Sequence, residues 1–322
     1  MTIDIIPDIH GQHDALLAAL RGLGWRRAGT GWTHPEPDRR ILFLGDLIDR
    51  GPENAAVIRT VRSLIDEDRA DLILGNHELN AMQFHTPHPE TGRPLRRNDE
   101  KNTRQHRAFL AEFPPGAERT REVIGWLRTI PLLIERDGFR AVHAAWAELT
   151  VAALRDLLPA LRLDEAALVR SADETDPLHP LVEEVTKGPE TKLPPGITFR
   201  DKDGTERDAV RLRWWQGGAA SWREIAMSVP DLDSIPDEAL PEHVRAQTYH
   251  EEAPPVFFGH YWLNGAPRLQ APNALCLDYS AGAGGPLMSY AMEGGAPLSL
   301  DRLRAHGPGA RELAAPLDAP AP

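Results

Sequence analysis

The sequence is poor in several features that define large classes of proteins. Cys276 is the only cysteine among 322 residues, which excludes an intramolecular disulfide framework and a thiolate-held metal cluster. A net charge of −12 argues against the broad basic surface that grips nucleic-acid phosphates. The N-terminus has no basic region followed by a long apolar run, so neither a signal peptide nor a membrane span is predicted. We expect a cytoplasmic protein without membrane partners.

What the first half does contain is an alternation of short apolar runs with helical patterns. The strand-like runs are "IDII" (3–6), "ILFL" (41–44), "LIL" (72–74), and "PLLIE" and "FRAVHA" (131–144). Between them, "DALLAALRGLG" and "NAAVIRTVRSLIDED" repeat apolar residues at helical spacing, and the second begins on Asn54, a residue suited to capping. This alternation predicts an α/β fold.

The second half changes character after about residue 147. Acidic helical stretches lead into "KGPETKLPPGITFRDKDGTERD", which is typical of loops and a hairpin. Strand-like runs return at "PVFFGH" (255–260), "ALCLDYS" (274–280) and "PLMSYAME" (286–293). We therefore predict a single domain over residues 1–306, interrupted by an inserted lobe at about 148–253. The Pro/Ala-rich residues 307–322 are predicted to be a disordered tail.

Five of the apolar runs end in side chains that bind metals. These side chains are Asp8, His10, Asp46, Asn76, His77, His143 and His260. Taken singly, each is explained as a turn residue, a helix cap or a hydrogen-bonded core histidine. Together they indicate one site, because ligands bind outside the carboxyl ends of strands in open α/β sheets. Glycines directly before Asp46, Asn76 and His260 would let the backbone approach a ligand closely.

The donor atoms of this set predict the metal. Carboxylate, amide and imidazole groups without sulfur suit borderline divalent ions, so we expect Mn²⁺, with Fe or Zn²⁺ as alternatives. The expected ligands are Asp8, His10, Asp46, Asn76, His143 and His260. Six ligands exceed the usual four of a structural zinc site, which favours two adjacent ions sharing a bridging carboxylate. Such a centre would attract phosphate locally within an acidic protein.

The motifs that carry these residues resemble those of the calcineurin-like metallophosphoesterases. They are "DIHG" (8–11), "GDLIDRG" (45–51), "GNHE" (75–78), "VHA" (142–144) and "FGHY" (258–261). The resemblance covers residues 1–145 and 255–292, and it is closest to the phosphoprotein phosphatase branch, which includes bacterial diadenosine tetraphosphatase-like enzymes. Trp262 stands where many phosphodiesterases of the superfamily have a second histidine, which favours this branch. The implied fold is an α-β-β-α sandwich of two mixed sheets flanked by helices.

The resemblance also implies a role for each residue. Asp8 and His10 would hold the first metal, Asp46 would bridge, and Asn76, His143 and His260 would hold the second. Arg50 would bind the phosphate together with Asn76, and His77 would be the general acid, oriented by Asp49. In the segment "LCLDYSAGAGGPL", Asp278 is a candidate partner behind the ligands, and "GAGG" is interpreted as a turn between strands.

The phosphatase branch supplies a second phosphate-binding arginine from its later sequence, and the resemblance implies such a residue in "RLRWW" (211–215). Strand alternation would place Arg211 and Arg213 on one face, and Leu212 and Trp214 on the other. Arg213 is slightly preferred as the phosphate ligand, and a neighbouring tryptophan could stack on a base or close the pocket. The alternative is an amphipathic surface strand.

Eight other histidines have polar or charged neighbours and are interpreted as solvated. They are His13, His34, His85, His88, His106, His179, His243 and His250. The locally basic stretch "RPLRRNDEKNTRQHR" (93–107) is interpreted as a solvated loop and helix face, with guidance of a phosphorylated substrate as the alternative.

The predicted activity is hydrolysis of phosphate monoesters by metal-activated water, resembling the serine/threonine protein phosphatases. The alternative within this class is a hydrolase of dinucleoside polyphosphates of the diadenosine tetraphosphate type. The partner is in either case a phosphorylated substrate, a phosphoprotein or a nucleotide. A non-catalytic regulatory module that binds phosphate is the alternative from a different class, but such a module needs no general acid, and His77, Asp49 and Arg50 are all present.

Overall fold

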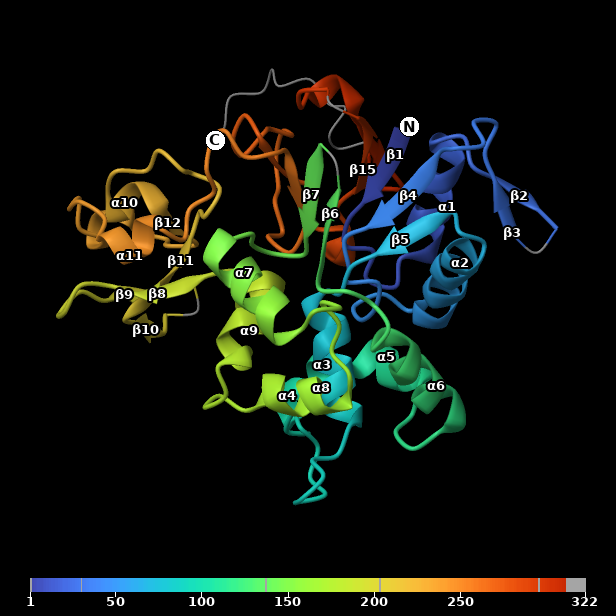
Figure 1. The fold of residues 1–322 in the computed structure, drawn as a ribbon, viewed down its shortest axis with the longest axis horizontal. Helices are drawn as coiled ribbons and strands as arrows, with labels where there is room; N and C mark the ends of the chain where they lie inside the picture. Colours follow the sequence, from blue (N-terminus) through green and yellow to red (C-terminus); the bar gives the residue numbers. More distant parts are fainter. Residues whose placement is uncertain (1, 30, 137, 203, 295, 311–322) are drawn as a thin grey trace.

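Two mixed β-sheets form the centre of the fold in a computed structural model of the chain (Figure 1). The structure describes residues 2–29, 31–136, 138–202, 204–294 and 296–310. The first sheet has the order β16 (Leu303–His306), β15 (Leu287–Glu293), β1 (Thr2–Ile6), β4 (Arg40–Phe43) and β5 (Ala70–Leu72). The second has the order β14 (Ala274–Cys276), β13 (Val256–Phe258), β7 (Phe139–Val142) and β6 (Leu133–Arg136). Strands β1, β4 and β5 are parallel to one another, as are β7, β13 and β14.

The two sheets pack face to face because the side chains along each strand alternate between apolar and polar and point alternately to opposite faces of the sheet. Ile3 and Ile5 of β1 contribute to a buried cluster shared with Phe139 and Phe257 of the second sheet. Asp4, between the two isoleucines, points to the opposite face and accepts a hydrogen bond of 3.0 Å from the indole of Trp25. The period of two residues thus separates the inner layer from the helix-covered faces.

Helices cover both outer faces of this sandwich. On the first sheet lie α1 (His13–Gly22) and α2 (Asn54–Asp66), whose Leu16 and Val61 share one cluster with Phe43. On the second sheet lie α7 (Glu148–Leu157) and α9 (Leu178–Lys187), whose Val151 and Val185 pack in the same cluster as Phe258. The predicted α-β-β-α sandwich of two mixed sheets is confirmed.

A group of helices lies beyond the carboxyl ends of the central strands, at the bottom of Figure 1. It consists of α3 (Asn76–His85), α4 (Glu100–Gln105), α5 (Arg107–Glu112), α6 (Glu118–Leu127) and α8 (Glu165–Ala172). Helix α3 begins directly after β5 and contacts α6 and α8. The group therefore encloses the edge at which the predicted site residues emerge.

Asn54 does not cap α2 in the way the sequence suggests. It is the first residue of the helix, and Glu112 at the end of α5 accepts hydrogen bonds from the backbone N–H groups of Asn54 (2.6 Å) and Ala55 (3.1 Å). The side chain of Asn54 instead accepts a 2.6 Å bond from the backbone N–H of Asp49. The carboxylate of Glu112, from another helix, thus caps the N-terminus of α2, where the helix dipole is positive.

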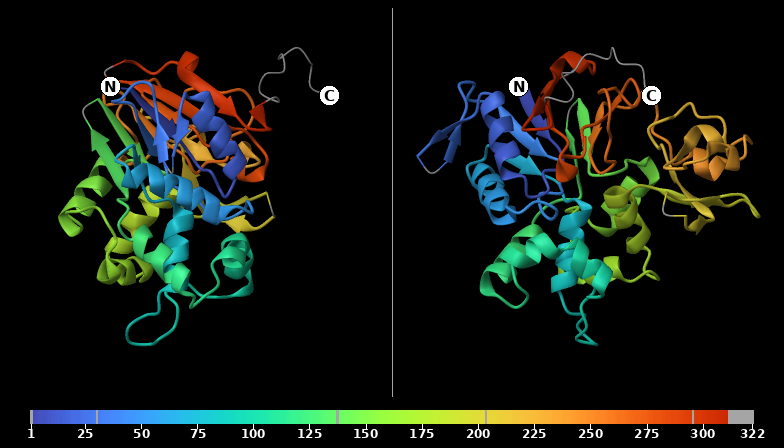
Figure 2. Two further views of the ribbon diagram at one scale, coloured as in Figure 1. Left: turned by 90° about the vertical axis from the view of Figure 1, so that its right-hand side faces the viewer. Right: turned by 180° about the vertical axis from the view of Figure 1, so that it is seen from behind.

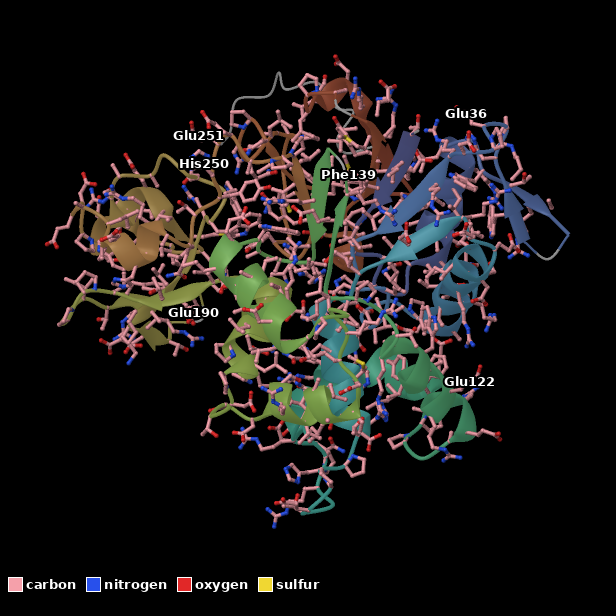
Figure 3. All side chains as sticks on the ribbon, viewed as in Figure 1. Glu36, Glu122, Phe139, Glu190, His250 and Glu251 are labelled. Atoms are coloured by element: carbon pink, nitrogen blue, oxygen red, sulfur yellow. The ribbon has the colours of Figure 1, made fainter. Side chains whose placement is uncertain are left out.

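The predicted insertion at 148–253 contains two kinds of structure. Helices α7 to α9 belong to the main core, whereas the strands and helices that follow build a separate lobe with its own hydrophobic cluster. The lobe contains β8 (Glu190–Lys192), the hairpin of β9 (Phe199–Arg200) and β10 (Glu206–Arg207), β11 (Ala209–Leu212), α10 (Trp222–Ile225), β12 (Ala226–Met227) and α11 (Glu242–Arg245). Figures 1 and 2 show it beside the sandwich, and Figure 3 marks its Glu190 on the opposite side of the view from Glu122 of α6.

A short hairpin and a turn complete the described fold. The short hairpin of β2 (Arg26–Ala28) and β3 (Gly31–Thr33) extends from the first sheet, and the predicted turn at "GAGG" lies between β14 and β15. Among the described residues, no helix combines the length and apolarity required to cross a bilayer. Most of the predicted tail, 311–322, lies outside the described residues.

Candidate active site

Five strand ends meet at one buried site, as the sequence pattern predicts. The segments after β1, β4 and β5 arrive from the first sheet, and those after β7 and β13 arrive from the second. The site therefore lies at the shared carboxyl edge of two sheets rather than of one. Its most buried side chains, each 1% exposed or less, include Asp8, His10, Asp46 and His143.

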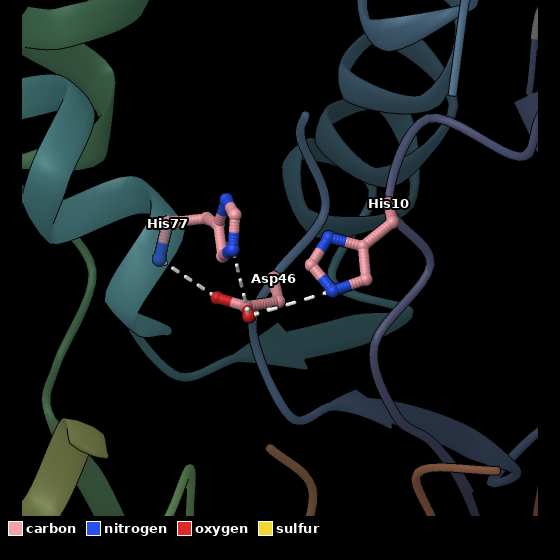
Figure 4. A group of neighbouring side chains, drawn as sticks. All are labelled: His10, Asp46 and His77. Atoms are coloured by element: carbon pink, nitrogen blue, oxygen red, sulfur yellow. Dashed lines mark hydrogen bonds and ion pairs between the residues drawn. The ribbon is translucent and has the colours of Figure 1, made fainter. Parts of the chain in front are cut away.

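Asp46 lies at the centre of this site, close to three histidines. Its Oδ2 atom lies 3.4 Å from Nε2 of His143, 3.7 Å from Nε2 of His10 and 4.0 Å from Nε2 of His77. Its Oδ1 atom accepts a 2.9 Å hydrogen bond from the backbone N–H of His77, so the carboxylate orientation is fixed (Figure 4). One carboxylate thus faces imidazoles on both sides, which is the arrangement required of a bridging ligand.

A second cluster surrounds the side chain of Asn76. Its Oδ1 atom lies 2.8 Å from Nδ1 of His260 and 3.1 Å from Nε2 of His143. Asp8 lies at the back of this cluster, where its Oδ1 atom is 4.0 Å from Nε2 of His143 and accepts a 3.1 Å bond from the backbone N–H of His260. All six predicted metal ligands are therefore neighbours in space.

Unusual backbone geometry brings these side chains together. Positive φ angles occur at His10 (49°), Asp46 (51°), Asp49 (68°), Arg50 (67°) and His260 (71°), a region that costs non-glycine residues free energy. Two glycines permit close approaches: a Cβ on Gly75 would lie 2.3 Å from Oδ1 of Asp46, and one on Gly259 would lie 2.0 Å from Oδ2 of Asp8. Strain and glycines concentrated at one place indicate that the geometry of this site is maintained for function.

The residues fit a pair of divalent cations. Two sets of three side chains each bring ligand atoms within 4.8 Å of one another, His10 with Asp46 and His77, and Asp46 with His143 and His260. Nε2 of His10 and Nε2 of His260 are buried and have no hydrogen-bond partner among the described residues. Nδ1 of His10 donates to the carbonyl of Ile48 at 2.9 Å, which leaves its Nε2 lone pair available to a metal. His77 thus joins a candidate metal set in which the sequence placed Asp8.

Asp49 connects the site to two histidines. Its Oδ2 atom accepts a 2.6 Å hydrogen bond from Nδ1 of His77, and its Oδ1 atom accepts a 2.9 Å bond from Nδ1 of His106. Burial alone would raise the pKa of Asp49, but the hydrogen bonds from His106 and His77 outweigh it and lower the pKa to about 2. Burial would likewise lower the pKa of His77, but Asp46 and Asp49 outweigh it and raise the pKa above 6.5. His77 is therefore held with its Nδ1 on Asp49 and its Nε2 facing Asp46, and its raised pKa favours the protonated imidazole.

Two further carboxylates stabilise the loops that carry these residues. Glu78 accepts hydrogen bonds from the backbone N–H groups of Asp46 (2.7 Å), Leu47 (2.8 Å) and Gly75 (3.1 Å), so it ties the loop after β4 to the start of α3. Asp278 accepts from the backbone N–H of Trp262 at 2.7 Å, which supports the loop that carries His260. The sequence predicted Asp278 as a partner behind the ligands but gave Glu78 no role.

A cavity of about 320 Å³ opens beside the predicted metal ligands. It is lined by His77, Asp49, Arg50, Asn76 and Arg211, together with Asn80, Phe84, Arg96, Asn102, Gln105, His106, His260 and Trp262. The guanidinium of Arg50 lies over the ring of Trp262, 5.2 Å from its centroid. A second cavity of about 670 Å³ shares Arg211, His260 and Trp262 with the first and extends toward the lobe.

Comparison with known proteins decides the family. The sequence model described as calcineurin-like phosphoesterase matches residues 1–176, more than half of the chain. The chain belongs to the calcineurin-like phosphoesterase family. This membership places it among metal-dependent phosphohydrolases.

Two relatives illustrate the sequence similarity. A symmetrical bis(5′-nucleosyl)-tetraphosphatase of Chromohalobacter salexigens is 28% identical over 319 residues, covering 92% of this chain and 96% of the relative. An asymmetrical bis(5′-nucleosyl)-tetraphosphatase PrpE of Halalkalibacterium halodurans is 39% identical over 77 residues, covering 24% of this chain. In this second case the match spans only 31% of the relative's length. Among solved structures, a cold-active protein-tyrosine phosphatase of a psychrophilic Shewanella species superposes with a TM-score of 0.55 at 16% identity, over 95% of this chain and 80% of that one, which shows a shared fold.

The two arginines predicted from "RLRWW" occupy different places in this phosphoesterase. Arg211, on β11, lines both cavities, whereas Arg213 follows the strand and lines neither of them. The placement favours Arg211 over the preferred Arg213 as the phosphate ligand. The suggestion that a neighbouring tryptophan stacks on a base is wrong for Trp214, whose ring is fully buried and whose Nε1 donates to the hydroxyl of Tyr261 at 3.0 Å.

The segment 93–107 is where the sequence interpretation missed site residues. Arg96, Asn102, Gln105 and His106 all line the smaller cavity, although most of the segment is exposed. The interpretation of His106 as solvated is wrong, because it is 5% exposed and bound to Asp49. Its polar neighbours in the sequence gave no sign of this burial, which comes from the bond to Asp49 and from stacking on Phe109, three residues later in α5.

Proposed function

We propose that this phosphoesterase hydrolyses dinucleoside polyphosphates. The observation that carries the proposal is the pair of cavities that meet at Arg211, His260 and Trp262, since a dinucleotide needs room on both sides of the bond that is cleaved. The tetraphosphatase relative that aligns along 92% of the chain supports the same substrate class.

The site supplies the parts that such a reaction needs. Divalent ions held by Asp8, His10, Asp46, Asn76, His143 and His260 would supply activated water and stabilise charge on the phosphoryl oxygens when bound. Arg50 and Arg211 face the cavity and bind the phosphoryl group that is attacked. His77, whose Nδ1 is held by Asp49, gives the proton on its Nε2 to the departing oxygen.

The same phosphoryl pocket supports a second candidate activity on phosphate monoesters. Arg50 and His77 line the cavity and would meet the phosphoryl group and its immediate oxygens, and these atoms are common to monoesters and polyphosphates. We expect hydrolysis of p-nitrophenyl phosphate and, with lower efficiency than the dinucleotide, of a phosphopeptide.

The proposal is tested by assaying purified protein with Mn²⁺, Zn²⁺ or Fe²⁺ on diadenosine tetraphosphate, p-nitrophenyl phosphate and a phosphoserine peptide in parallel. Asp46→Asn should reduce turnover by roughly 10³-fold or more. Asp68→Asn, at a 92% exposed carboxylate, is the matched control and should leave turnover unchanged. Folded, metal-loaded protein that cleaves none of the substrates would contradict the enzyme assignment. A large preference for the phosphopeptide would contradict the dinucleotide assignment.

A further inference from the structure

Three arginines face the smaller cavity, and the phosphoryl group that is attacked accounts for two of them. Arg50, Arg96 and Arg211 all line this 320 Å³ space. By contrast, Arg39, Arg128 and Arg140 each lie within hydrogen-bond distance of a carboxylate, at 2.8, 3.1 and 2.7 Å. Arg96 comes from the segment between α3 and α4, outside the metallophosphoesterase motifs. Its charge therefore has no assigned partner in the reaction described above.

Arg96 is held in place by hydrogen bonds to neutral groups, and the charges of Glu183, Asp99 and Asp49 act on it only through space. Its Nη2 donates a 2.8 Å hydrogen bond to Oδ1 of Asn102, and its backbone N–H donates a 3.0 Å bond to the carbonyl of Gln83. Asn102 is itself fixed, because its Nδ2 donates to the carbonyl of Arg97 at 2.8 Å. Burial lowers the pKa of Arg96 from its usual value, the direction expected of a partly desolvated cation. A cation restrained in this way beside a cavity is suited to an anionic ligand.

The position of His77 assigns a side to each cavity. His77 lines the smaller cavity and does not line the larger one. A general acid must reach the departing oxygen, so the leaving group of the reaction lies in the smaller cavity with Arg96. The part of the substrate that stays on the attacked phosphorus then extends past Arg211 toward the larger cavity, which Phe199 and Lys202 of the lobe also line.

We propose that Arg96, positioned by Asn102, binds the phosphate groups of a nucleotide leaving group. This assignment rests on the proposed hydrolase function and names the leaving-group subsite of that same site. In the reaction, the P–O bond to the leaving nucleotide breaks and water supplies the new oxygen on phosphorus. The departing oxygen takes the proton of His77, and the proton lost by water passes to solvent.

The test compares Arg96→Gln with Arg97→Gln in the metal-loaded protein. Arg97 is the adjacent residue with a 90% exposed side chain, so its substitution changes the net charge equally without touching the cavity. Arg96→Gln should raise KM for diadenosine tetraphosphate about 10- to 100-fold more than KM for p-nitrophenyl phosphate, whose leaving group has no phosphate. Arg97→Gln should leave both KM values within about twofold.

Inhibition by the leaving nucleotide gives a second readout that needs no turnover of the dinucleotide. ADP should inhibit p-nitrophenyl phosphate hydrolysis competitively, and Arg96→Gln should raise its inhibition constant about 10-fold or more. Equal changes in KM for both substrates, or an unchanged ADP inhibition constant, would overturn the subsite. Wild-type protein that hydrolyses neither substrate would instead contradict the proposed function. If p-nitrophenyl phosphate is cleaved and the dinucleotide is not, the ADP constants alone decide whether Arg96 binds the nucleotide.

Discussion

At the scale of single residues, the side chain of Asp49 is more tightly constrained than a simple acid–base pair requires. Both of its oxygens are occupied, one by His77 and the other by His106, and its backbone N–H donates to Asn54. Nε2 of His106 in turn lies 3.2 Å from Nε2 of His85. Burial and the neighbouring His106 lower the pKa of His85 to about 4, so at neutral pH this outer histidine is uncharged. The chain of hydrogen bonds orients Asp49, and through it His77.

His106 is therefore predicted to be a positioning residue for His77. His106→Phe keeps the ring that stacks on Phe109 but removes the donor to Asp49, and we expect kcat to fall roughly 10-fold with little change in KM for p-nitrophenyl phosphate. His106→Asn can still donate a hydrogen bond and should recover part of kcat. The measurement is steady-state kinetics with denaturant unfolding of each variant. If the two variants have equal kcat values, or if kcat follows stability alone, the positioning role is contradicted.

The difference between Asp46 and His106 shows what a sequence can reveal at this scale. Asp46 follows an apolar strand and a glycine, so its place at a sheet edge is predictable from local pattern. His106 lies among polar residues at the junction of two six-residue helices, and its partner Asp49 is 57 positions away. The contact between His106 and Asp49 depends on how α4 and α5 pack under α3. It therefore cannot be predicted from a local periodicity of the sequence. Arg96 and Asn102 were missed for the same reason.

At the scale of elements, α2 and α5 are linked by one carboxylate that also influences the site. Glu112 accepts hydrogen bonds from the first N–H groups of α2 and a 3.0 Å bond from Nδ2 of Asn54. The side chain of Asn54 accepts a hydrogen bond from the backbone N–H of Asp49. The first turn of α2 therefore restrains the loop that carries Asp49 and Arg50. The sequence predicted the helix and its first residue, but a cap from a segment 58 positions away could not be predicted.

Removing this cap should affect stability and catalysis together. Glu112→Ala leaves the first N–H groups of α2 without an acceptor and should lower the free energy of unfolding by about 1–2 kcal/mol. It should also lower kcat severalfold, because Asp49 loses part of its support. Glu122→Ala, at a 65% exposed carboxylate paired with Arg62, is the matched control and should change stability by less than about 0.5 kcal/mol. Urea unfolding and kinetics would show the idea to be wrong if both variants behaved alike.

At the scale of the whole molecule, the lobe contributes Arg211 to a site that the sandwich builds. Trp214 and Trp215 follow β11 and pack against Phe258 of β13, and Nε1 of Trp214 donates to the hydroxyl of Tyr261. Tyr261 adjoins His260, so the lobe is attached next to a predicted metal ligand. The change in composition predicts an inserted lobe at about 148–253, but it does not predict attachment through two tryptophans, because "RLRWW" alternates like a surface strand.

Weakening this attachment should reduce both the stability of the protein and its binding of substrate. Tyr261→Phe leaves the buried indole N–H of Trp214 without an acceptor, which should cost about 1–2 kcal/mol in unfolding free energy and raise KM severalfold as Arg211 becomes less restrained. Tyr290→Phe is the matched control, since its hydroxyl accepts a 3.1 Å bond from the N–H of Ser299 away from the site. The control should lose stability and keep its KM. If KM rises equally in the Tyr261→Phe and Tyr290→Phe variants, the attachment does not act on Arg211.

The stability of the whole molecule should also depend on divalent ions, independently of any activity. Asp8, Asp46 and Asp278 are buried carboxylates of one site, and two buried imidazole nitrogens there have no hydrogen-bond partner among the described residues. Ions that bind only the folded chain add about 2.7 kcal/mol per site at a concentration of 100 times Kd. Thermal unfolding of chelator-treated wild type should therefore shift upward with added Mn²⁺, and Asp46→Asn should lose most of this concentration dependence because it removes the carboxylate shared by both ligand sets. If the Tm of the wild type does not change on addition of Mn²⁺, Zn²⁺ or Fe²⁺, these side chains do not hold a metal pair.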